Sequence, residues 1–191
     1  MPDRENIRFN TLRNALYHTG RRRSFERMNR FCNFTLVLLG AAVVGDLAAR
    51  YGVESLWPGV AVACISAVQL VLDFGGRARD HQLLQREYFN LLAEIEQVIS
   101  ATDDQCAEWY SRMIRITADE PPVLRALDAK AFNDAMDATG LYDREDRLLV
   151  PFRHRLVACF LAFDGYTYKT FREHAAEAER KRAGKGSKQP A

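Results

Sequence analysis

The sequence predicts an all-α membrane protein, in which a two-helix transmembrane hairpin follows an amphipathic N-terminal helix and precedes a cytosolic helical bundle. Three observations predict this fold class. Two apolar segments lie back to back, arginines are concentrated before the first, and apolar residues beyond the second recur every three or four positions. We divide the chain into a basic pre-membrane segment (1–30), the hairpin (31–72), a cytosolic helical region (73–180) and a disordered basic tail (181–191).

Two apolar segments have the length of membrane-spanning helices. Residues 31–49 contain a single charged residue, Asp46, and residues 55–72 contain none. A hydrocarbon core about 30 Å thick takes roughly 20 helical residues at 1.5 Å rise each, so both segments qualify if Asp46 reaches the interface. The short connector, residues 50–54, forces the two helices to run antiparallel.

The alternative is that both segments are core helices of a soluble bundle. Helices in such bundles usually carry polar positions every three or four residues. The stretch from Val60 to Leu72 carries only Ser66 and Gln69 as polar residues. This composition favours the membrane over the soluble bundle.

The positive charge of the chain lies mainly before the first apolar segment. Residues 1–30 hold eight arginines and three acidic residues, a net charge of +5, whereas the connector holds one arginine. Because basic residues mark the cytoplasmic side of a span, we expect both termini in the cytoplasm and a multi-pass topology. The candidates for lipid-headgroup contact are Arg21, Arg22, Arg23, Arg27 and Arg30, although a role in topology alone explains them equally well.

The segment before the first span has the pattern of an amphipathic helix. Between Ile7 and Met28, arginines alternate with apolar residues such as Phe9 and Leu16. This spacing suits a helix lying along the membrane surface, with Gly20 as the place where it would break.

Beyond Gly76, the periodicity indicates packed helices. The glycines at 75 and 76 favour a joint, without which the second span would continue as one helix. The apolar stripe of the first helix consists of Leu84, Tyr88, Leu91, Ile95 and Val98, widened by Leu92 and Ile99.

The ends of the later helices carry recognisable signals. Thr102 and Gln105 form a predicted capping box that opens one helix. The two prolines at 121–122 are expected to end that helix and to occupy the first turn of the next, which Gly140 terminates. A last helix is expected over residues 148–179.

Enzyme signatures are absent from the sequence. It contains no glycine-rich phosphate loop, no HExxH and no GxSxG, so we expect no catalytic residue, cofactor or metal site. The four cysteines are far apart, and we expect them to be free thiols. Nucleic-acid binding is not expected, because the basic cluster adjoins a span. The four histidines are isolated and each is expected to be solvated or interfacial: His18, His81, His154 and His174.

The polar residues inside the spans are the candidate functional residues. Asn33 and Gln69 fall at similar depth in an antiparallel hairpin, where their amides would either hydrogen-bond to each other or line a wet path in an oligomer. Asp46 either pairs with Arg50, one turn later, or contributes to a ring of charge at a pore mouth.

Small residues are dense in both spans. Membrane helices approach one another closely where side chains are small, so these positions predict tight packing within the hairpin or between protomers. They are Ala41, Gly45, Gly59, Ala63 and Ala67.

Three segments of the chain carry a resemblance to a known family. They are Leu16-Tyr-His-Thr-Gly-Arg-Arg-Arg-Ser-Phe-Glu-Arg before the hairpin, Tyr88-Phe-Asn-Leu-Leu after it, and Asp119-Glu-Pro-Pro-Val-Leu-Arg-Ala-Leu continuing to Phe132-Asn133. With this order of elements, about residues 10 to 140 of the chain resemble the SLATT family. These are bacterial two-span domains found beside nucleotide-second-messenger synthases and nucleotide sensors.

The resemblance implies an effector in the bacterial inner membrane that forms a pore or perturbs the membrane when a cytosolic nucleotide-linked signal arrives, in defence against phage. It implies the lipid bilayer, further copies of the chain, and a nucleotide synthase or sensor protein as partners. Two other readings stay open: a passive anchor or scaffold that recruits a cytosolic partner, and, with least support, a membrane-tethered enzyme.

Overall fold

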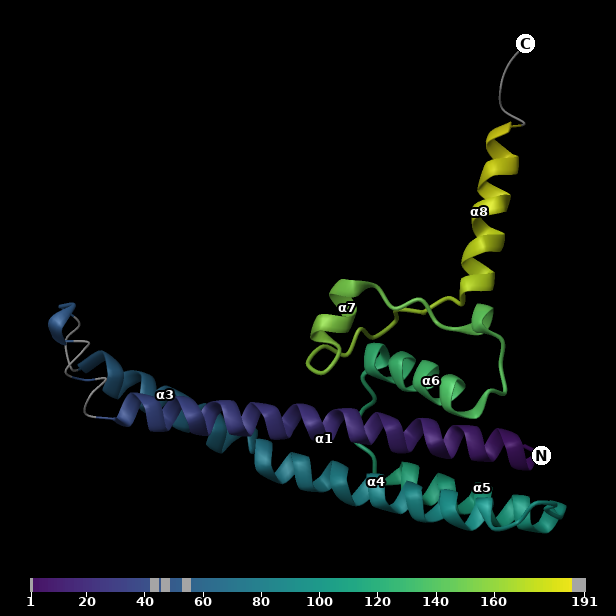
Figure 1. The fold of residues 1–191 in the computed structure, drawn as a ribbon, viewed down its shortest axis with the longest axis horizontal. Helices are drawn as coiled ribbons and strands as arrows, with labels where there is room; N and C mark the ends of the chain where they lie inside the picture. The colour runs from purple at the N-terminus through teal and green to yellow at the C-terminus, as the bar shows by residue number, and fades with distance from the viewer. Residues whose placement is uncertain (1, 42–44, 46–48, 53–55, 187–191) are drawn as a thin grey trace. The chain divides into compact units, whose positions relative to one another are not determined.

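A computed structural model describes residues 2–41, 45, 49–52 and 56–186 of the chain (Figure 1). These residues are mostly helical and contain no β-strand, which confirms the prediction of an all-α chain for this part. The elements are α1 (Arg4–Gly40), α3 (Leu56–Leu72), α4 (Phe74–Glu96), α5 (Asp103–Ala118), α6 (Arg125–Thr139), the 3-10 helix η1 (Arg144–Asp146), α7 (Phe152–Val157) and α8 (Phe171–Gly186).

The chain forms two compact units. The first consists of residues 1–20 and 84–191, and the second of residues 21–83. The helices α1 and α4 each contribute residues to both units.

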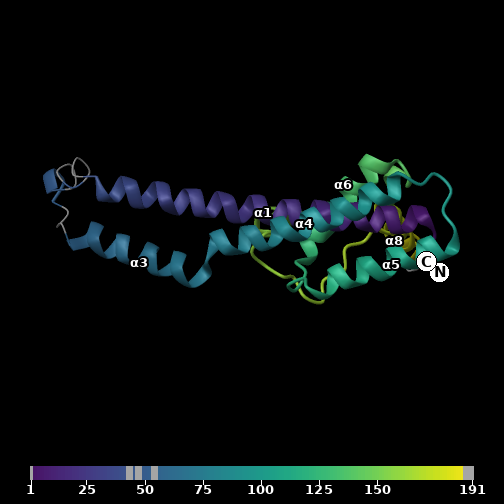
Figure 2. The ribbon, with the colours of Figure 1, turned by 90° about the horizontal axis from the view of Figure 1, so that it is seen from below.

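The core of the first unit forms where the beginning of α1 packs with α4 and α5 (Figure 2). Tyr88, Leu91 and Ile95 are buried, which confirms the predicted apolar stripe. Ile99 does not widen it: α4 ends at Glu96, and the Ile99 side chain is exposed. The buried members of this core are Ile7, Ala15, Tyr88, Leu91, Ile95, Cys106, Trp109 and Ile116.

The N-terminal segment differs from its prediction in two respects. First, α1 continues through Gly20 without a break, and the missing side chain there lets α6 approach: a Cβ on Gly20 would lie 3.2 Å from Leu127 Cδ1. Second, Ile7 and Phe9 are buried in protein. The apolar face of residues 4–20 therefore packs on other helices and does not lie along a membrane surface.

The helix ends at α5 and at the end of α6 confirm the sequence signals. The capping box of α5 is formed reciprocally by Thr102 and Gln105. At the end of α6, Gly140 adopts the left-handed conformation, with φ 64°, that favours glycine.

Pro121 and Pro122 were predicted to lie in the first turn of α6. They precede the helix instead, because α6 begins only at Arg125. The segment before it is held extended by long-range bonds: the backbone N–H of Leu124 donates to the Tyr17 hydroxyl, and that of Arg125 donates to the carbonyl of Ala162. These contacts delay the start of the helix beyond the prolines.

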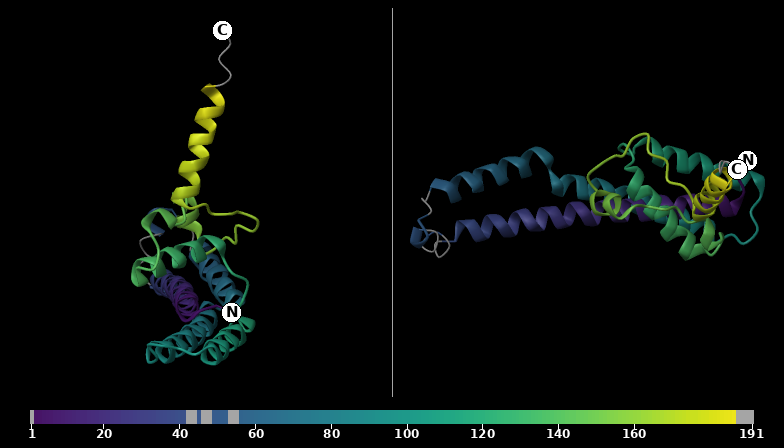
Figure 3. Two further views of the ribbon diagram at one scale, coloured as in Figure 1. Left: turned by 90° about the vertical axis from the view of Figure 1, so that its right-hand side faces the viewer. Right: turned by 90° about the horizontal axis from the view of Figure 1, so that it is seen from above.

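The prediction of a single last helix over residues 148–179 is wrong. Two separate helices, α7 and α8, stand there, and the chain turns between them at Phe163 and Gly165, which both have positive φ. Figure 3 shows the two helices and their connection. The α8 helix continues to Gly186, past Lys181 where the disordered tail was predicted to start; residues 187–191 lie outside the described part.

The second unit is built from the end of α1, from α3 and from the beginning of α4. Phe25, Cys32, Phe74 and Ala78 form its small buried cluster. The predicted joint is present, centred on Asp73 rather than on the glycines. Asp73 has a φ of 38°, and its carboxylate accepts a 2.9 Å hydrogen bond from the backbone N–H of Gly76.

Candidate functional site

The second unit exposes an extended apolar surface. No residue of α3 is buried, and among the described residues one helical stretch, α3 followed by α4 (Leu56–Glu96), is long and apolar enough to cross a membrane. The first predicted span is helical from Phe31 to Gly40, but residues 42–44 and 46–48 lie outside the described part. Large exposed apolar residues on the two helices are Phe31, Phe34, Val37, Leu38, Leu56, Trp57, Val60, Val68, Leu70, Val71 and Leu72.

An amide cluster interrupts this apolar surface. The side-chain nitrogen of Gln69 on α3 donates to the side-chain oxygen of Asn33 at 2.7 Å and to that of Asn29 at 3.0 Å, both on α1. The bond between the two amides singled out in the sequence is therefore present. Asn29 is a third member that sequence reasoning missed, although it lies one helical turn before Asn33.

The amide cluster keeps unused hydrogen-bonding groups. Both donors of Gln69 are engaged, but the NH₂ groups of Asn29 and Asn33 and the Oε1 atom of Gln69 have no partner among the described residues. Asn33 is exposed, and Asn29 and Gln69 are partly exposed, so none of these amides is buried. These groups can therefore hydrogen-bond to water or to a partner outside this chain.

Further polar residues continue the site along α3. Ser66 and Gln69 are three residues apart on one face of α3, and Asp73 follows directly after the end of this helix. Together with Leu70, they line an open hollow of about 520 Å³. The site thus presents hydroxyl, amide and carboxylate groups beside exposed apolar side chains.

The small residues predicted to pack helices remain uncovered. Gly59, Ala63 and Ala67 on α3 are exposed, as are Ala41 and Gly45. A Cβ on Gly45 or Gly59 would meet no described atom within 4 Å. Within the described residues, these positions do not form a helix–helix contact inside the chain. Asp46, the remaining predicted site residue, lies outside the described part.

The arginine cluster before the first span is partly neutralised. Arg22 and Arg30 both form ion pairs with Glu26, at 3.2 and 3.4 Å, and the Arg21 guanidinium lies over the Phe25 ring. Arg23 and Arg27 are exposed and form no ion pair with another described residue. These last two are therefore the arginines most available to lipid headgroups.

A buried polar cluster lies in the first unit, where the sequence predicted a solvated histidine. His18 is fully buried, with its Nε2 atom 3.1 Å from Glu120 Oε1. The Tyr88 hydroxyl donates to the same carboxylate oxygen and lies 2.9 Å from Thr117 Oγ1. Burial, followed by the bond to Glu120, raises the pKa of Tyr88. The prediction for His81 is also wrong, since it is buried and stacks on Phe25.

The three segments that carry the family resemblance converge on this cluster. Tyr17 and His18 come from the first segment, Tyr88 from the second, and Glu120 and Leu124 from the third. Residues separated by up to 107 positions thus meet in one contact network. The sequence feature that could have indicated this buried cluster is Tyr88, the one tyrosine in an otherwise aliphatic stripe.

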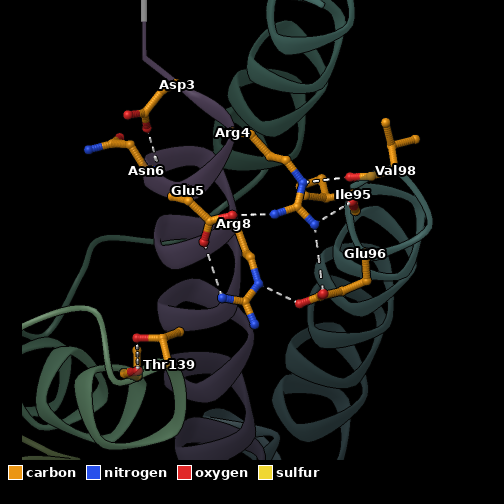
Figure 4. Close-up of polar contacts among 10 residues, drawn as sticks. Asp3, Arg4, Glu5, Asn6, Arg8, Ile95, Glu96, Val98 and Thr139 are labelled. Carbon is orange, nitrogen blue, oxygen red and sulfur yellow. Dashed lines mark hydrogen bonds and ion pairs between the residues drawn. The ribbon is translucent and has the colours of Figure 1, made fainter. Parts of the chain in front are cut away.

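The first unit also holds a cluster of ion pairs at the beginning of α1 (Figure 4). Arg4 donates to the backbone carbonyls of Ile95 and Val98, at 3.2 and 2.6 Å, and Arg8 pairs with Glu96. These bonds tie the beginning of α1 to the last turn of α4 and to Val98 just beyond it, so we assign the cluster a structural role.

Comparisons of the chain with protein-family models, with curated proteins and with solved structures find no match. Fold and site together define a helical protein with one candidate membrane-spanning helix in the part of the chain that the structure describes.

Proposed function

We propose that this chain is an oligomeric effector of the bacterial inner membrane. Residues 31–49 and 55–72 span the bilayer as a hairpin, with both termini in the cytoplasm. Copies of the chain assemble through the hairpin, and a cytosolic nucleotide-linked signal makes the assembly form a pore or perturb the membrane, in defence against phage.

The amide cluster is the observation that carries this proposal. Asn29, Asn33 and Gln69 use only part of their hydrogen-bonding capacity inside the chain, yet they stand on an apolar surface. Lipid offers no partner for an amide. A second copy of the chain, or water in a path between copies, supplies such partners.

The exposed apolar side chains support the membrane over a soluble bundle. A core helix of a soluble protein is mostly buried, whereas no residue of α3 is buried. In water, such a surface costs about 25 cal/mol for each square ångström that remains exposed. Lipid chains remove this cost, and the uncovered Gly59, Ala63 and Ala67 permit close approach of a second helix.

The nucleotide-linked signal and the phage-defence role rest on the SLATT resemblance. One residue from each of its three segments meets the others in the first unit: His18, Tyr88 and Glu120. We assign to this unit the reception of the signal, delivered by a nucleotide synthase or sensor protein.

The test is the membrane potential of bacteria expressing the chain at controlled levels. We expect the parent chain to depolarise cells that also contain the activating signal, and the double variant Asn33→Leu/Gln69→Leu to be inactive there at equal membrane abundance. The matched control is Val71→Leu, which changes an exposed residue of α3 outside the amide cluster. Depolarisation that persists at full strength in the double variant would contradict the proposed role of the amides.

The second candidate function is a passive membrane anchor that recruits a cytosolic partner. It is favoured by the hydrogen bonds that Gln69 makes within one chain, which are sufficient for packing two helices. In that case neither the parent chain nor the double variant depolarises cells that also contain the activating signal. Both would instead retain the recruited partner at the membrane.

A further inference from the structure

The α7 helix and the turn after it carry an apolar surface of their own in the first unit. Phe152, Leu156 and Phe160 are spaced four residues apart, and 71%, 65% and 60% of each is exposed. The neighbouring Leu161 is 52% exposed. The bonds from the N–H groups of residues 160 and 161 to the Val157 carbonyl continue the helical turn, so Phe152, Leu156 and Phe160 lie on one side of the segment.

Other residues of the same segment are already packed. Ala158 is buried, and Cys159, Ala162 and Phe163 pack against the cluster around α6. The segment is therefore fixed by its inner side, and its outer side is apolar where a water-exposed turn would be polar. The outward residues are consequently available to a partner other than this chain.

Charge identifies the kind of partner. No acidic residue occurs from residue 148 to residue 163, whereas Arg153 and Arg155 stand among the outward apolar residues. Both arginines are exposed, and neither forms an ion pair with another described residue. Aromatic and aliphatic side chains interleaved with unpaired arginines are the composition of segments that insert into the interface of anionic membranes.

We propose that residues 152–161 form an interfacial anchor that inserts into the headgroup region of an anionic bilayer. Phe152, Leu156 and Phe160 enter the boundary of the acyl chains, and Arg153 and Arg155 contact lipid phosphates. This inference rests on the proposed membrane location, because the span tethers the first unit to the bilayer and raises its effective concentration there. It adds a second membrane contact outside the hairpin.

The test uses the full chain in lipid nanodiscs, with its native cysteines replaced and a nitroxide label at Phe160→Cys. Accessibility of the label to oxygen and to a water-soluble nickel chelate is measured with zwitterionic and with anionic lipid. The matched control is a label at Ala138→Cys, an exposed position on α6. We expect at least a threefold loss of nickel accessibility at position 160, with oxygen accessibility retained, in anionic nanodiscs only.

Three results would overturn the inference. A label at 160 as accessible to nickel as that at 138 shows that the segment stays in water. Shielding from both reagents in either lipid, with spin–spin broadening, shows that a second copy covers it. Shielding that survives the Arg153→Gln/Arg155→Gln double variant shows that the arginines do not select the lipid.

Hydrogen exchange of the unmodified chain in the same nanodiscs provides a second readout that needs no substitution. The amides of residues 152–161 are expected to exchange more slowly with anionic than with zwitterionic lipid, and equal exchange would contradict the anchor. Failure of the chain to enter nanodiscs at all would instead count against the proposed function.

Discussion

At the scale of single residues, the contact between His18, Tyr88 and Glu120 is the feature that most distinguishes the first unit from a plain apolar bundle. The Glu120 carboxylate is largely buried and receives the Tyr88 hydroxyl and His18 at the same oxygen atom. A buried carboxylate is stable only while its partners remain, because removal of one exposes the full cost of its desolvation. The cluster therefore specifies how α1, α4 and the segment before α6 pack.

Substitution of Tyr88→Phe is expected to destabilise the first unit by about 1–3 kcal/mol, because Glu120 loses a donor while the ring still fills its site. Thermal unfolding of the detergent-solubilised chain measures the effect. The control is Tyr110→Phe, which alters a partly exposed ring on α5. Equal melting temperatures for the two variants would show that the hydroxyl of Tyr88 contributes nothing.

The raised pKa of Tyr88 predicts a loss of stability at high pH. In the unfolded chain this tyrosine ionises near its ordinary pKa of 10.0, whereas burial and Glu120 keep it protonated in the folded chain. Its contribution is therefore complete below pH 10 and is lost as the pH rises above 10, at up to about 1.4 kcal/mol per pH unit. Urea midpoints from pH 8 to pH 11 should fall more steeply for the parent chain than for Tyr88→Phe. Parallel curves would contradict the raised pKa.

At the scale of elements, the joint at Asp73 determines where α3 ends and α4 begins. A Cβ on Gly76 would lie 2.0 Å from Asp73 Oδ2, whereas the nearest atom to a Cβ on Gly75 is 4.0 Å away. Gly76→Ala must therefore displace the carboxylate that accepts the Gly76 N–H, while Gly75→Ala meets an ordinary contact.

We expect Gly75→Ala to preserve or raise the melting temperature, since alanine is favoured over glycine in a helix by about 1 kcal/mol. Gly76→Ala should be less stable than Gly75→Ala by about 1–3 kcal/mol, because the capping bond is lost. Circular dichroism in detergent gives the comparison. Indistinguishable variants would mean that Asp73 does not define the joint.

Features encoded by neighbouring residues could be predicted from the sequence. The stripe of α4, the capping box at Thr102 and the glycine end at Gly140 depend on periodicity or on backbone conformation within one turn. The burial of His18 could not be predicted in the same way, because it depends on Glu120, about a hundred residues away. The late start of α6 likewise depends on Tyr17, which holds the N–H of Leu124.

Part of the candidate site could also be predicted from the sequence. Polar residues inside apolar helices are conspicuous, so Asn33 and Gln69 could be chosen from sequence, and their antiparallel depth implied the bond that the structure contains. Asn29 was overlooked because it precedes the apolar segment, where an amide carries no special signal. The exposed apolar face of α7 was not predicted, because one long final helix was expected over these residues.

At the scale of the whole molecule, we propose that the exposed apolar surfaces of α1 and α3 face lipid. The exposed arginines before the hairpin and the charged residues of the first unit are then on one side of the bilayer. The proposed function uses this division: we propose that the hairpin acts on the membrane and that the first unit receives the signal.

The most direct test of this central claim is the topology of the chain in bacterial cells. Alkaline phosphatase, active only outside the cytoplasm, is inserted after Tyr51 or fused after Ala191, and green fluorescent protein is placed at the same two positions. We expect phosphatase activity only for the insertion after Tyr51, and fluorescence only for the fusion at the C-terminus. Fluorescence without phosphatase activity at both positions would contradict it, because the connector would then remain in the cytoplasm and the hairpin would not span the membrane.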